Sequence, residues 1–240
     1  MKAVLSRELL RRRFRRALPG YEKQARIQAE AAARLLEAVC GISSSWPRIL
    51  EVGCGPGLFT RPACERLEFE IYLACDLLPE CRSKLPRGVF FVVADGEAPP
   101  VSPEAFHLVV SSSVIQWFRR PREGLLALAR ALAPGGVLAV STFGPETLKE
   151  MPGRRRPPGL LSLETWLSFK PPSFRLLAAE RALRRISWES PGELLRYLKE
   201  TGVAGGLPPG ELGPLRRWLS GPGPFHLTFE LETFLWQRVV

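Results

Sequence analysis

Two hydrophobic periodicities follow one another in a regular order along this chain. Short apolar runs have the length and residue types of buried strands, and apolar positions at helical spacing recur between them. The predicted strands are residues 47–52, 71–75, 89–94, 106–113, 135–143, 181–190 and 226–237. The predicted helices are residues 22–40, 57–67, 121–132 and 190–202. Strands that alternate with helices at such short spacing require parallel pairing, so we predict a doubly wound, mostly parallel seven-stranded α/β sheet.

One stretch interrupts this rhythm. Residues 151–180 are rich in Pro, Gly and Arg, and they predict a small helical cap inserted into the α/β fold. The expected organisation is therefore an N-terminal helical segment, a core, the cap and a C-terminal part that completes the sheet. The corresponding ranges are residues 1–45, 46–150, 151–180 and 181–240.

The composition is that of an ordinary soluble protein. Of the 240 residues, 45% are hydrophobic and 24% are charged, and no apolar run approaches the length of a membrane span. The first residues lack the apolar region of a secretory signal, so we expect a cytoplasmic protein without a membrane partner. Five cysteines without a C-x-x-C pair, supplemented by two histidines, favour neither a metal site nor a disulfide framework.

The net charge of +10 is unevenly distributed. Residues 1–34 carry +7 and residues 151–200 carry +5, whereas residues 35–150 carry −2. Two interpretations remain open: a docking surface for an acidic partner, or solvated basic faces of helices.

A glycine-rich turn follows the first predicted strand. Gly53, Gly55 and Gly57 lie in the segment EVGCGPG, between a strand and a helix, where bare backbone permits a ligand to approach closely. The acidic Glu51 precedes the glycines, and the spacing differs from the dinucleotide fingerprint G-x-G-x-x-G. A carboxylate there suits a ligand amino group, such as that of a methionyl moiety, and repels two phosphates.

Two aspartates mark the next two strands. Asp76 and Asp95 are the only aspartates, against twenty-two glutamates, and each follows a predicted parallel strand. Ribose hydroxyls are held at the first of these places in such folds, so Asp76 is a candidate ribose ligand. Asp95, with Gly96 and Glu97, would border an adenine and accept from its amine. These groups together favour S-adenosylmethionine as the cofactor.

With these features the chain resembles the class I, Rossmann-like methyltransferases. More specifically, it resembles the malonyl-[acyl-carrier protein] O-methyltransferases of biotin biosynthesis, over nearly its whole length. The motifs that carry this resemblance include Phe14, YEKQARIQ at 21–28, SSSVIQWF at 111–118, STFGPETLKE at 141–150, LLRYLKETGV at 194–203 and HLTFELETF at 226–234.

The resemblance implies transfer of a methyl group to the free carboxylate of a malonyl thioester on acyl carrier protein, with S-adenosylhomocysteine as the second product. A carboxylate is already ionised at neutral pH, so this reaction needs no general acid or base. Alignment of the reactants and exclusion of water would then provide catalysis.

The resemblance also suggests residue roles. Arg196 would grip the malonyl carboxylate, with Lys199 as a second candidate, and Gln116 and Trp117 would lie where substrate meets methyl. Tyr21 and Gln28, seven residues apart on one side of the N-terminal helix, could close over the cofactor. The full expected cofactor set is Tyr21, Gln28, Glu51, Gly53, Gly55, Gly57, Asp76, Leu77, Asp95, Gly96, Glu97 and Ser111.

Acyl carrier protein is acidic, so the basic segments become candidates for its docking surface. The arginines expected to take part are Arg11, Arg12, Arg13, Arg15, Arg16, Arg154, Arg155, Arg156, Arg184 and Arg185. Two other functions are a non-catalytic assembly factor on the same scaffold and an RNA methyltransferase. The intact set of three carboxylates argues against the first, and the lack of a recognisable RNA-binding module argues against the second.

Overall fold

The computed structural model describes residues 6–153, 156–202 and 212–239. Arg154 and Arg155 lie outside the described residues. The helices are α1 Arg7–Gln24, α2 Arg26–Cys40, α3 Thr60–Arg66, α4 Pro121–Arg130, α5 Leu163–Ser168, α6 Pro191–Thr201 and α7 Leu212–Leu219, with short 3-10 turns η1 Pro79–Lys84 and η2 Ile115–Trp117. The strands are β1 Arg48–Val52, β2 Ile71–Asp76, β3 Val89–Val93, β4 Phe106–Ser112, β5 Leu132–Phe143, β6 Phe174–Trp188 and β7 Phe225–Arg238.

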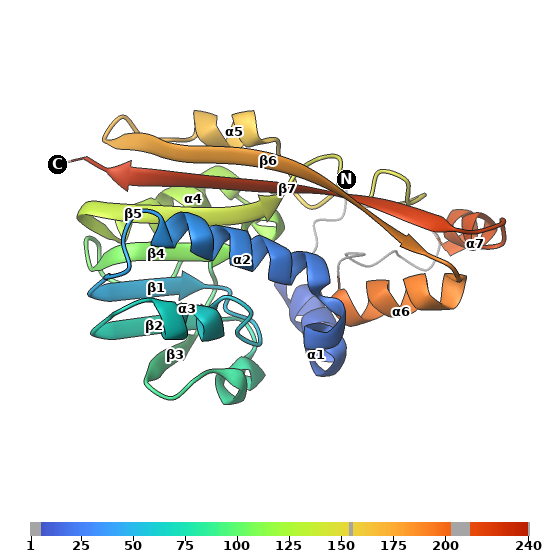
Figure 1. Ribbon diagram of the computed structural model, residues 1–240, viewed down its shortest axis with the longest axis horizontal. Helices are drawn as coiled ribbons and strands as arrows, with labels where there is room; N and C mark the ends of the chain where they lie inside the picture. The colour runs from blue at the N-terminus through green and yellow to red at the C-terminus, as the bar shows by residue number, and fades with distance from the viewer. Residues whose placement is uncertain (1–5, 154–155, 203–211, 240) are drawn as a thin grey trace.

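The seven strands form one sheet in the order β3-β2-β1-β4-β5-β7-β6 (Figure 1). The first five strands pair in parallel, whereas β7 lies antiparallel to both β5 and β6. The chain order reverses between β1 and β4, and the space beyond the carboxyl ends of strands at such a reversal is where open α/β sheets bind ligands. The predicted doubly wound, mostly parallel sheet is confirmed.

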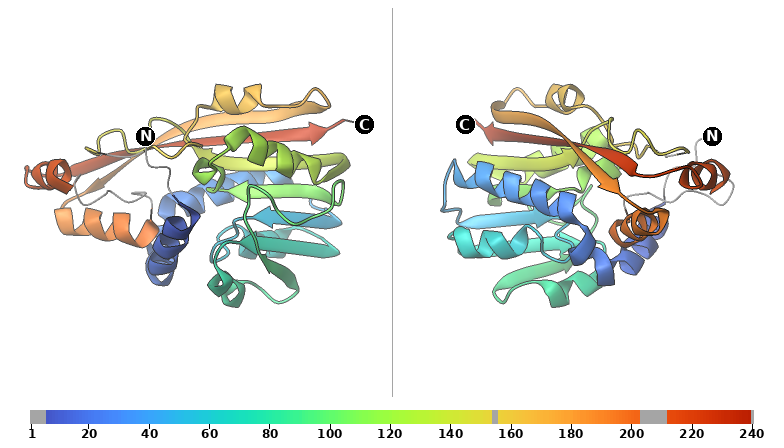
Figure 2. Two further views of the ribbon diagram at one scale, coloured as in Figure 1. Left: turned by 180° about the vertical axis from the view of Figure 1, so that it is seen from behind. Right: turned by 45° about the vertical axis from the view of Figure 1, so that its right-hand side comes forward.

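Helices cover both faces of the sheet (Figures 1 and 2). Successive strand residues point to opposite faces, so Ile49 packs in the cluster beneath α2 and α3, and Leu50 packs in the cluster beneath α4 and α5. Ile49 and Leu50 are both fully buried although they point to opposite faces. Burial on both faces explains why the central strands are continuous hydrophobic runs in the sequence.

The β6–β7 hairpin extends past the end of β5 and carries α6 and α7 (Figure 1). A third apolar cluster fills this extension, with Tyr197 and Leu198 of α6 packed against Phe229 of β7. Strand β6 begins at Phe174, seven residues before the predicted Arg181. Residues 174–180 therefore belong to the sheet, and α5 is the helix of the expected cap segment.

The N-terminal segment is two helices rather than the single predicted helix. Helix α1 ends at Gln24, and Ala25 leaves the helical conformation with φ −76° and ψ 45° before α2 begins at Arg26. Helix α1 packs chiefly on α6. Among the described helices, none is both long and apolar enough to cross a membrane.

Candidate active site

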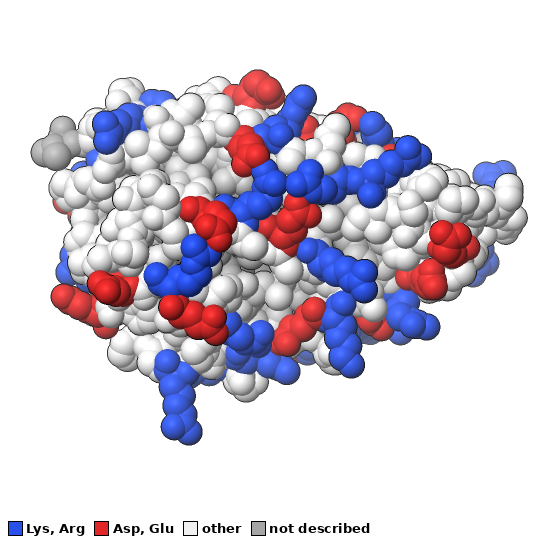
Figure 3. Space-filling model, viewed as in Figure 1, with Lys and Arg blue, Asp and Glu red and all other residues white. Residues whose placement is uncertain are grey.

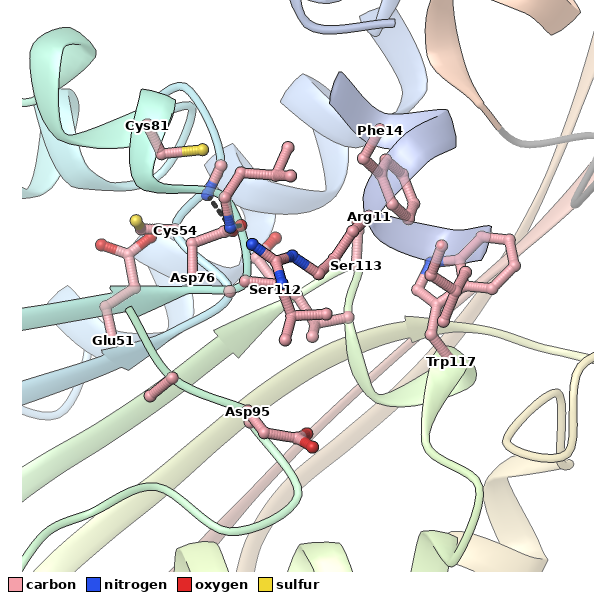
Figure 4. A pocket seen from close by; sticks show the side chains of 18 of the residues that line it. Arg11, Phe14, Glu51, Cys54, Asp76, Cys81, Asp95, Ser112, Ser113 and Trp117 are labelled. Atoms are coloured by element: carbon pink, nitrogen blue, oxygen red, sulfur yellow. Dashed lines mark hydrogen bonds between the residues drawn. The ribbon is translucent and has the colours of Figure 1, made fainter. Parts of the chain in front are cut away.

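A cavity of about 140 Å³ lies at the carboxyl ends of β1, β2 and β3 and beside β4, beneath α1 (Figure 4). Its walls contain four carboxylates, several backbone turns and a mostly apolar set of side chains. Of the predicted cofactor residues, the cavity is lined by Tyr21, Gln28, Glu51, Gly53, Gly55, Asp76, Leu77, Asp95, Gly96 and Glu97. Gly57 and Ser111 do not line it.

Glu51 is a buried carboxylate at the end of β1, with 2% of its surface exposed. Its Oε2 accepts hydrogen bonds from Thr60 Oγ1 at 2.7 Å and from Tyr72 Oη at 2.6 Å. Burial raises the pKa of Glu51 to about 7, although these two hydrogen bonds oppose the shift. A cationic ligand group beside Glu51 would favour its ionised form.

Asp76, at the end of β2, is fixed by the glycine-rich turn. Its Oδ2 accepts from Gly55 N and its Oδ1 accepts from Leu78 N, each at 2.9 Å. Burial raises the pKa of Asp76 above its usual range. Gly55 has φ +51° and open space where a side chain would begin, whereas a Cβ at Gly53, where φ is +74°, would collide with Val114. The turn thus presents bare backbone to the cavity.

Asp95 and Glu97 follow β3 and bind Arg7 of α1. Asp95 Oδ2 forms an ion pair with Arg7 Nη1, and Glu97 Oε2 lies 2.6 Å from Arg7 Nη2. Glu97 Oε1 also accepts from the backbone N of Arg120 at 2.8 Å. Glu97 therefore lines the cavity, but both of its oxygens already interact with other residues of the protein. Arg7 could not be predicted as part of this site, because its partners lie about ninety residues away in the chain.

Helix α1 closes the cavity from above. Tyr21 lies on α1 and Gln28 on α2, so the expectation that one helix carries both is wrong: the break at Ala25 separates them. Both still line the cavity, and burial raises the pKa of Tyr21 well above its usual range. Arg11, expected on a docking surface, instead lines this cavity and reaches from α1 toward it (Figure 4).

A second, smaller cavity of about 50 Å³ adjoins the first. The two share the lining residues Phe14, Tyr21, Gln28, Ser113 and Trp117. The other described residues around the second cavity are Gln116, Phe143, Thr147, Leu148, Met151, Pro157, Leu160 and Thr201. These walls are mostly apolar, and the shared residues form the junction through which a group could pass between the cavities.

Trp117 lies at this junction, after β4, and Gln116 precedes it in η2. Trp117 packs edge-on against Phe14 of α1, with ring centroids 5.5 Å apart. Gln116 is 3% exposed and lines the second cavity only. The serine preceding them was misassigned: Ser111 is buried and its Oγ donates to Val52 O at 3.2 Å, whereas Ser113 lines both cavities.

Strand β7 anchors the segment that walls the second cavity. Glu230 Oε2 accepts from Glu146 N at 2.7 Å, and Glu232 Oε1 accepts from Leu163 N at 2.8 Å. Burial and the nearby Glu230 raise the pKa of Glu232 to about 8. Glu232 Oε2 is buried and has no hydrogen-bond partner in the described part of the chain. Burial and the neighbouring carboxylate thus favour the protonated form of Glu232.

Comparisons with known proteins agree with this arrangement. Residues 9–204 match the family model described as a methyltransferase domain. The malonyl-[acyl-carrier protein] O-methyltransferase of Bacteroides thetaiotaomicron is 32% identical over 214 residues, which are 84% of this chain and 79% of the relative. The chain belongs to the malonyl-[acyl-carrier protein] O-methyltransferase family.

Two further comparisons extend this result. The biotin biosynthesis bifunctional protein of Bordetella avium is 36% identical over 155 residues, which are 62% of this methyltransferase and 33% of the relative. A crystal structure of a Bacillus halodurans protein described as a methyltransferase superposes with a TM-score of 0.64. It covers 88% of this chain and 100% of its own at 15% identity, so this likeness concerns the fold.

The predicted acyl-binding cations of this methyltransferase lie elsewhere. Arg196 and Lys199 are exposed on α6 and line neither cavity. The α6 side chains that turn inward are Leu194, Tyr197 and Leu198, because the apolar stripe of the amphipathic helix packs on β7. Their location gives no support to Arg196 as the carboxylate ligand.

The expected docking arginines fall into different environments. Arg12, Arg16, Arg156 and Arg185 are exposed, and Arg13 is half-buried and engaged with other groups. Two form ion pairs: Arg15 with Glu80 at 2.5 Å, and Arg184 with Glu30 at 2.6 Å. Basic side chains interleaved with acidic ones spread over the face that carries α1, α6 and β6 (Figure 3).

Proposed function

We propose that this protein transfers the methyl group of S-adenosylmethionine to the free carboxylate of a malonyl thioester on acyl carrier protein, in biotin biosynthesis. Membership of the family supports the substrate. The observation that carries the proposal is the placement of three carboxylates at the carboxyl ends of β1, β2 and β3, in a cavity that adjoins a second, apolar one.

The lining groups of the first cavity match the parts of S-adenosylmethionine. Glu51 faces the methionyl ammonium group, Asp76 accepts from the ribose hydroxyls, and Asp95 accepts from the adenine amine. Arg11 supplies the cation that the methionyl carboxylate requires. The apolar remainder of the wall suits the adenine ring.

The proposed methylation of a carboxylate requires no proton transfer by the protein. S-adenosylmethionine would supply a methyl group on a positively charged sulfur. The acceptor carboxylate forms the new oxygen–carbon bond while the carbon–sulfur pair remains on sulfur, giving S-adenosylhomocysteine without moving a proton. Helix α1 and the Phe14–Trp117 contact exclude water from the junction, and the fixed walls align the reactants.

The partner is acyl carrier protein, and its docking would use the basic face. Arg12 and Arg16 are exposed on α1, the helix that closes the first cavity, and neither has an ion pair among the described residues. Long-range attraction of this kind raises the rate of encounter more than the affinity.

Mass spectrometry tests the proposal directly. The purified protein, S-adenosylmethionine and malonyl carrier protein should yield a methyl ester on the carrier. The variant Asp76→Ala should bind cofactor more weakly by roughly 1–3 kcal/mol, the cost of unsatisfied buried groups. Failure of the wild-type protein to form the ester, with the carrier intact, would refute the proposed reaction.

A further inference from the structure

Ser113 is the most anomalous residue at the junction of the two cavities. It has φ +60°, a left-handed backbone conformation that side chains other than glycine rarely adopt. Its Oγ is buried and has no hydrogen-bond partner among the described residues. Backbone strain and an unsatisfied hydroxyl each carry a cost, and their coincidence at a cavity junction indicates a binding role.

Surrounding groups hold Ser113 in this conformation. Its N donates to Ser141 O at 2.8 Å, and its O accepts from Gln116 Nε2 at 2.7 Å. Gln116 Oε1 in turn accepts from Thr142 Oγ1 at 3.1 Å. The backbone of Ser113 is therefore fixed on both sides, whereas its hydroxyl stays available to a ligand.

A second unsatisfied group lies at the same junction. Gln28 is 4% exposed, and its Oε1 is buried without a partner in the described part of the chain. An amide oxygen accepts hydrogen bonds and favours positive charge, whereas a hydroxyl can donate to a carboxylate. The pair thus suits a cationic group on the Gln28 side and an anionic group on the Ser113 side.

The cations near the junction belong to the first cavity. Arg7, Arg11 and Arg119 line that cavity only, and no Lys or Arg is among the described residues that line the second. We infer that Ser113 Oγ orients the acceptor carboxylate at the junction, and that the cofactor's own positive charge, rather than a protein cation, is its counter-charge. This inference rests on the proposed carboxyl methylation.

The arrangement has a physical advantage. A guanidinium bound to the carboxylate would withdraw electron density from the attacking oxygen and would place a like charge beside the positively charged sulfur. A hydroxyl donor fixes the orientation of the carboxylate without either effect. Charge pairing between acceptor and cofactor then draws the reacting atoms together.

Binding measurements with two non-reacting cofactor analogues test the charge pairing. S-adenosylhomocysteine is neutral at sulfur, whereas sinefungin carries an amine at the position of the methyl group. Malonyl carrier protein should bind the sinefungin complex at least roughly tenfold more tightly, a factor equivalent to about 1.4 kcal/mol. Acetyl carrier protein, which lacks the carboxylate, should show no preference. Equal affinity of malonyl carrier for both complexes, in a protein that forms the methyl ester, would overturn the inference alone.

Variants of Ser113 test the hydroxyl separately from the backbone. Ser113→Gly relieves the strained φ and should fold at least as stably as the wild type, whereas Ser113→Ala retains the strain. Both should weaken binding of malonyl carrier to the sinefungin complex by roughly tenfold while S-adenosylhomocysteine affinity stays within about twofold.

Ser83→Ala is the matched control, because its hydroxyl donates to Glu80 O on the exposed surface. A loss of malonyl carrier binding in Arg11→Ala or Arg196→Ala, with acetyl carrier binding unchanged and with normal malonyl carrier binding in Ser113→Gly, would assign the carboxylate to a protein cation and refute the role of Ser113.

Discussion

Arg7 and Glu97 join helix α1 to the segment that follows β3 in the wall of the first cavity: Arg7 Nη2 lies 2.6 Å from Glu97 Oε2. The other nitrogen of the same guanidinium pairs with Asp95. Farther along α1, Arg15 pairs with Glu80, and Glu22 pairs with Arg61. Helix α1 packs chiefly on α6, and these ion pairs, together with the apolar contacts of Phe14 and Leu18, hold it against the core.

Removing the Arg7 side chain should let α1 open more often. We expect Arg7→Ala to raise the dissociation rate of S-adenosylhomocysteine by about fivefold, the factor equivalent to about 1 kcal/mol. Stopped-flow fluorescence measures this rate, with Arg12→Ala as the control because Arg12 is exposed on the same helix. High salt should reduce the difference in dissociation rate between Arg7→Ala and the wild type. Equal rates in both variants would show that the Arg7 pairs do not hold the helix.

Glu51 should make the stability of the cofactor-free protein depend on pH. Its pKa is about 7 in the folded protein and 4.5 for an unperturbed glutamate, so between these values the folded carboxyl holds a proton that the unfolded chain has lost. Stability is therefore full below about pH 4.5 and falls as pH rises to about 7, by up to about 3 kcal/mol. Urea unfolding of wild type and Glu51→Gln at pH 5 and 8 should show this loss in the wild type alone.

The same ionisation should affect cofactor binding. A methionyl ammonium group favours the charged form of Glu51, so affinity for S-adenosylhomocysteine should increase as pH rises to about 7 and then level off. Calorimetry in two buffers of different ionisation enthalpy should detect proton release at pH 6. The variant Glu51→Gln should bind more weakly without this pH dependence. Identical pH profiles of affinity for the two proteins would show that Glu51 does not bind the ammonium group.

Glu232 of β7, which accepts a hydrogen bond from Leu163 N, provides a second pH effect. Burial and the nearby Glu230 raise its pKa from 4.5 to about 8, so the folded carboxyl holds a proton that the unfolded chain loses above about pH 4.5. Glu232→Gln keeps an acceptor for Leu163 N and should match the wild type near pH 4. By pH 8 the variant should be the more stable, with the gap widening by up to about 1.4 kcal/mol per pH unit between about pH 4.5 and 8. Parallel thermal denaturation curves at both pH values would exclude this effect.

Carrier docking should depend on the exposed arginines of α1. Arg12→Glu/Arg16→Glu should raise the Michaelis constant for malonyl carrier by about threefold to tenfold at low salt, and less as salt shortens the screening length from roughly 10 Å at 0.1 M. The Michaelis constant for malonyl-CoA should change less. Arg216→Glu/Arg217→Glu, on α7 at the far end of the hairpin, is the control (Figure 1). Equal salt sensitivity of the Michaelis constants for the two substrates would rule out the proposed docking surface.

The sequence by itself determined those parts of the fold that depend on residues close to one another along the chain. The apolar runs of β1, β4 and β5 are buried on both faces, so hydrophobicity and length alone marked them as parallel strands. Helix α6 begins at the cap Ser190 and ends before Gly202, whose φ is +66°, as its sequence predicts. Glu51, Asp76 and Asp95 could be located because each lies at or just beyond the end of a strand, and parallel strands end at one edge of the sheet.

Only the tertiary structure decided what depends on residues distant in sequence. The break at Ala25 has no glycine or proline to mark it, and α1 takes its direction from its contact with α6. Ser111 and Ser113 look alike in sequence, yet the alternation of β4 and the left-handed turn after it bury one hydroxyl against Val52 and present the other at the cavity junction. Arg11 and Arg196 differ in the same way: charge is local, but whether it faces a cavity or the solvent depends on which helix packs where.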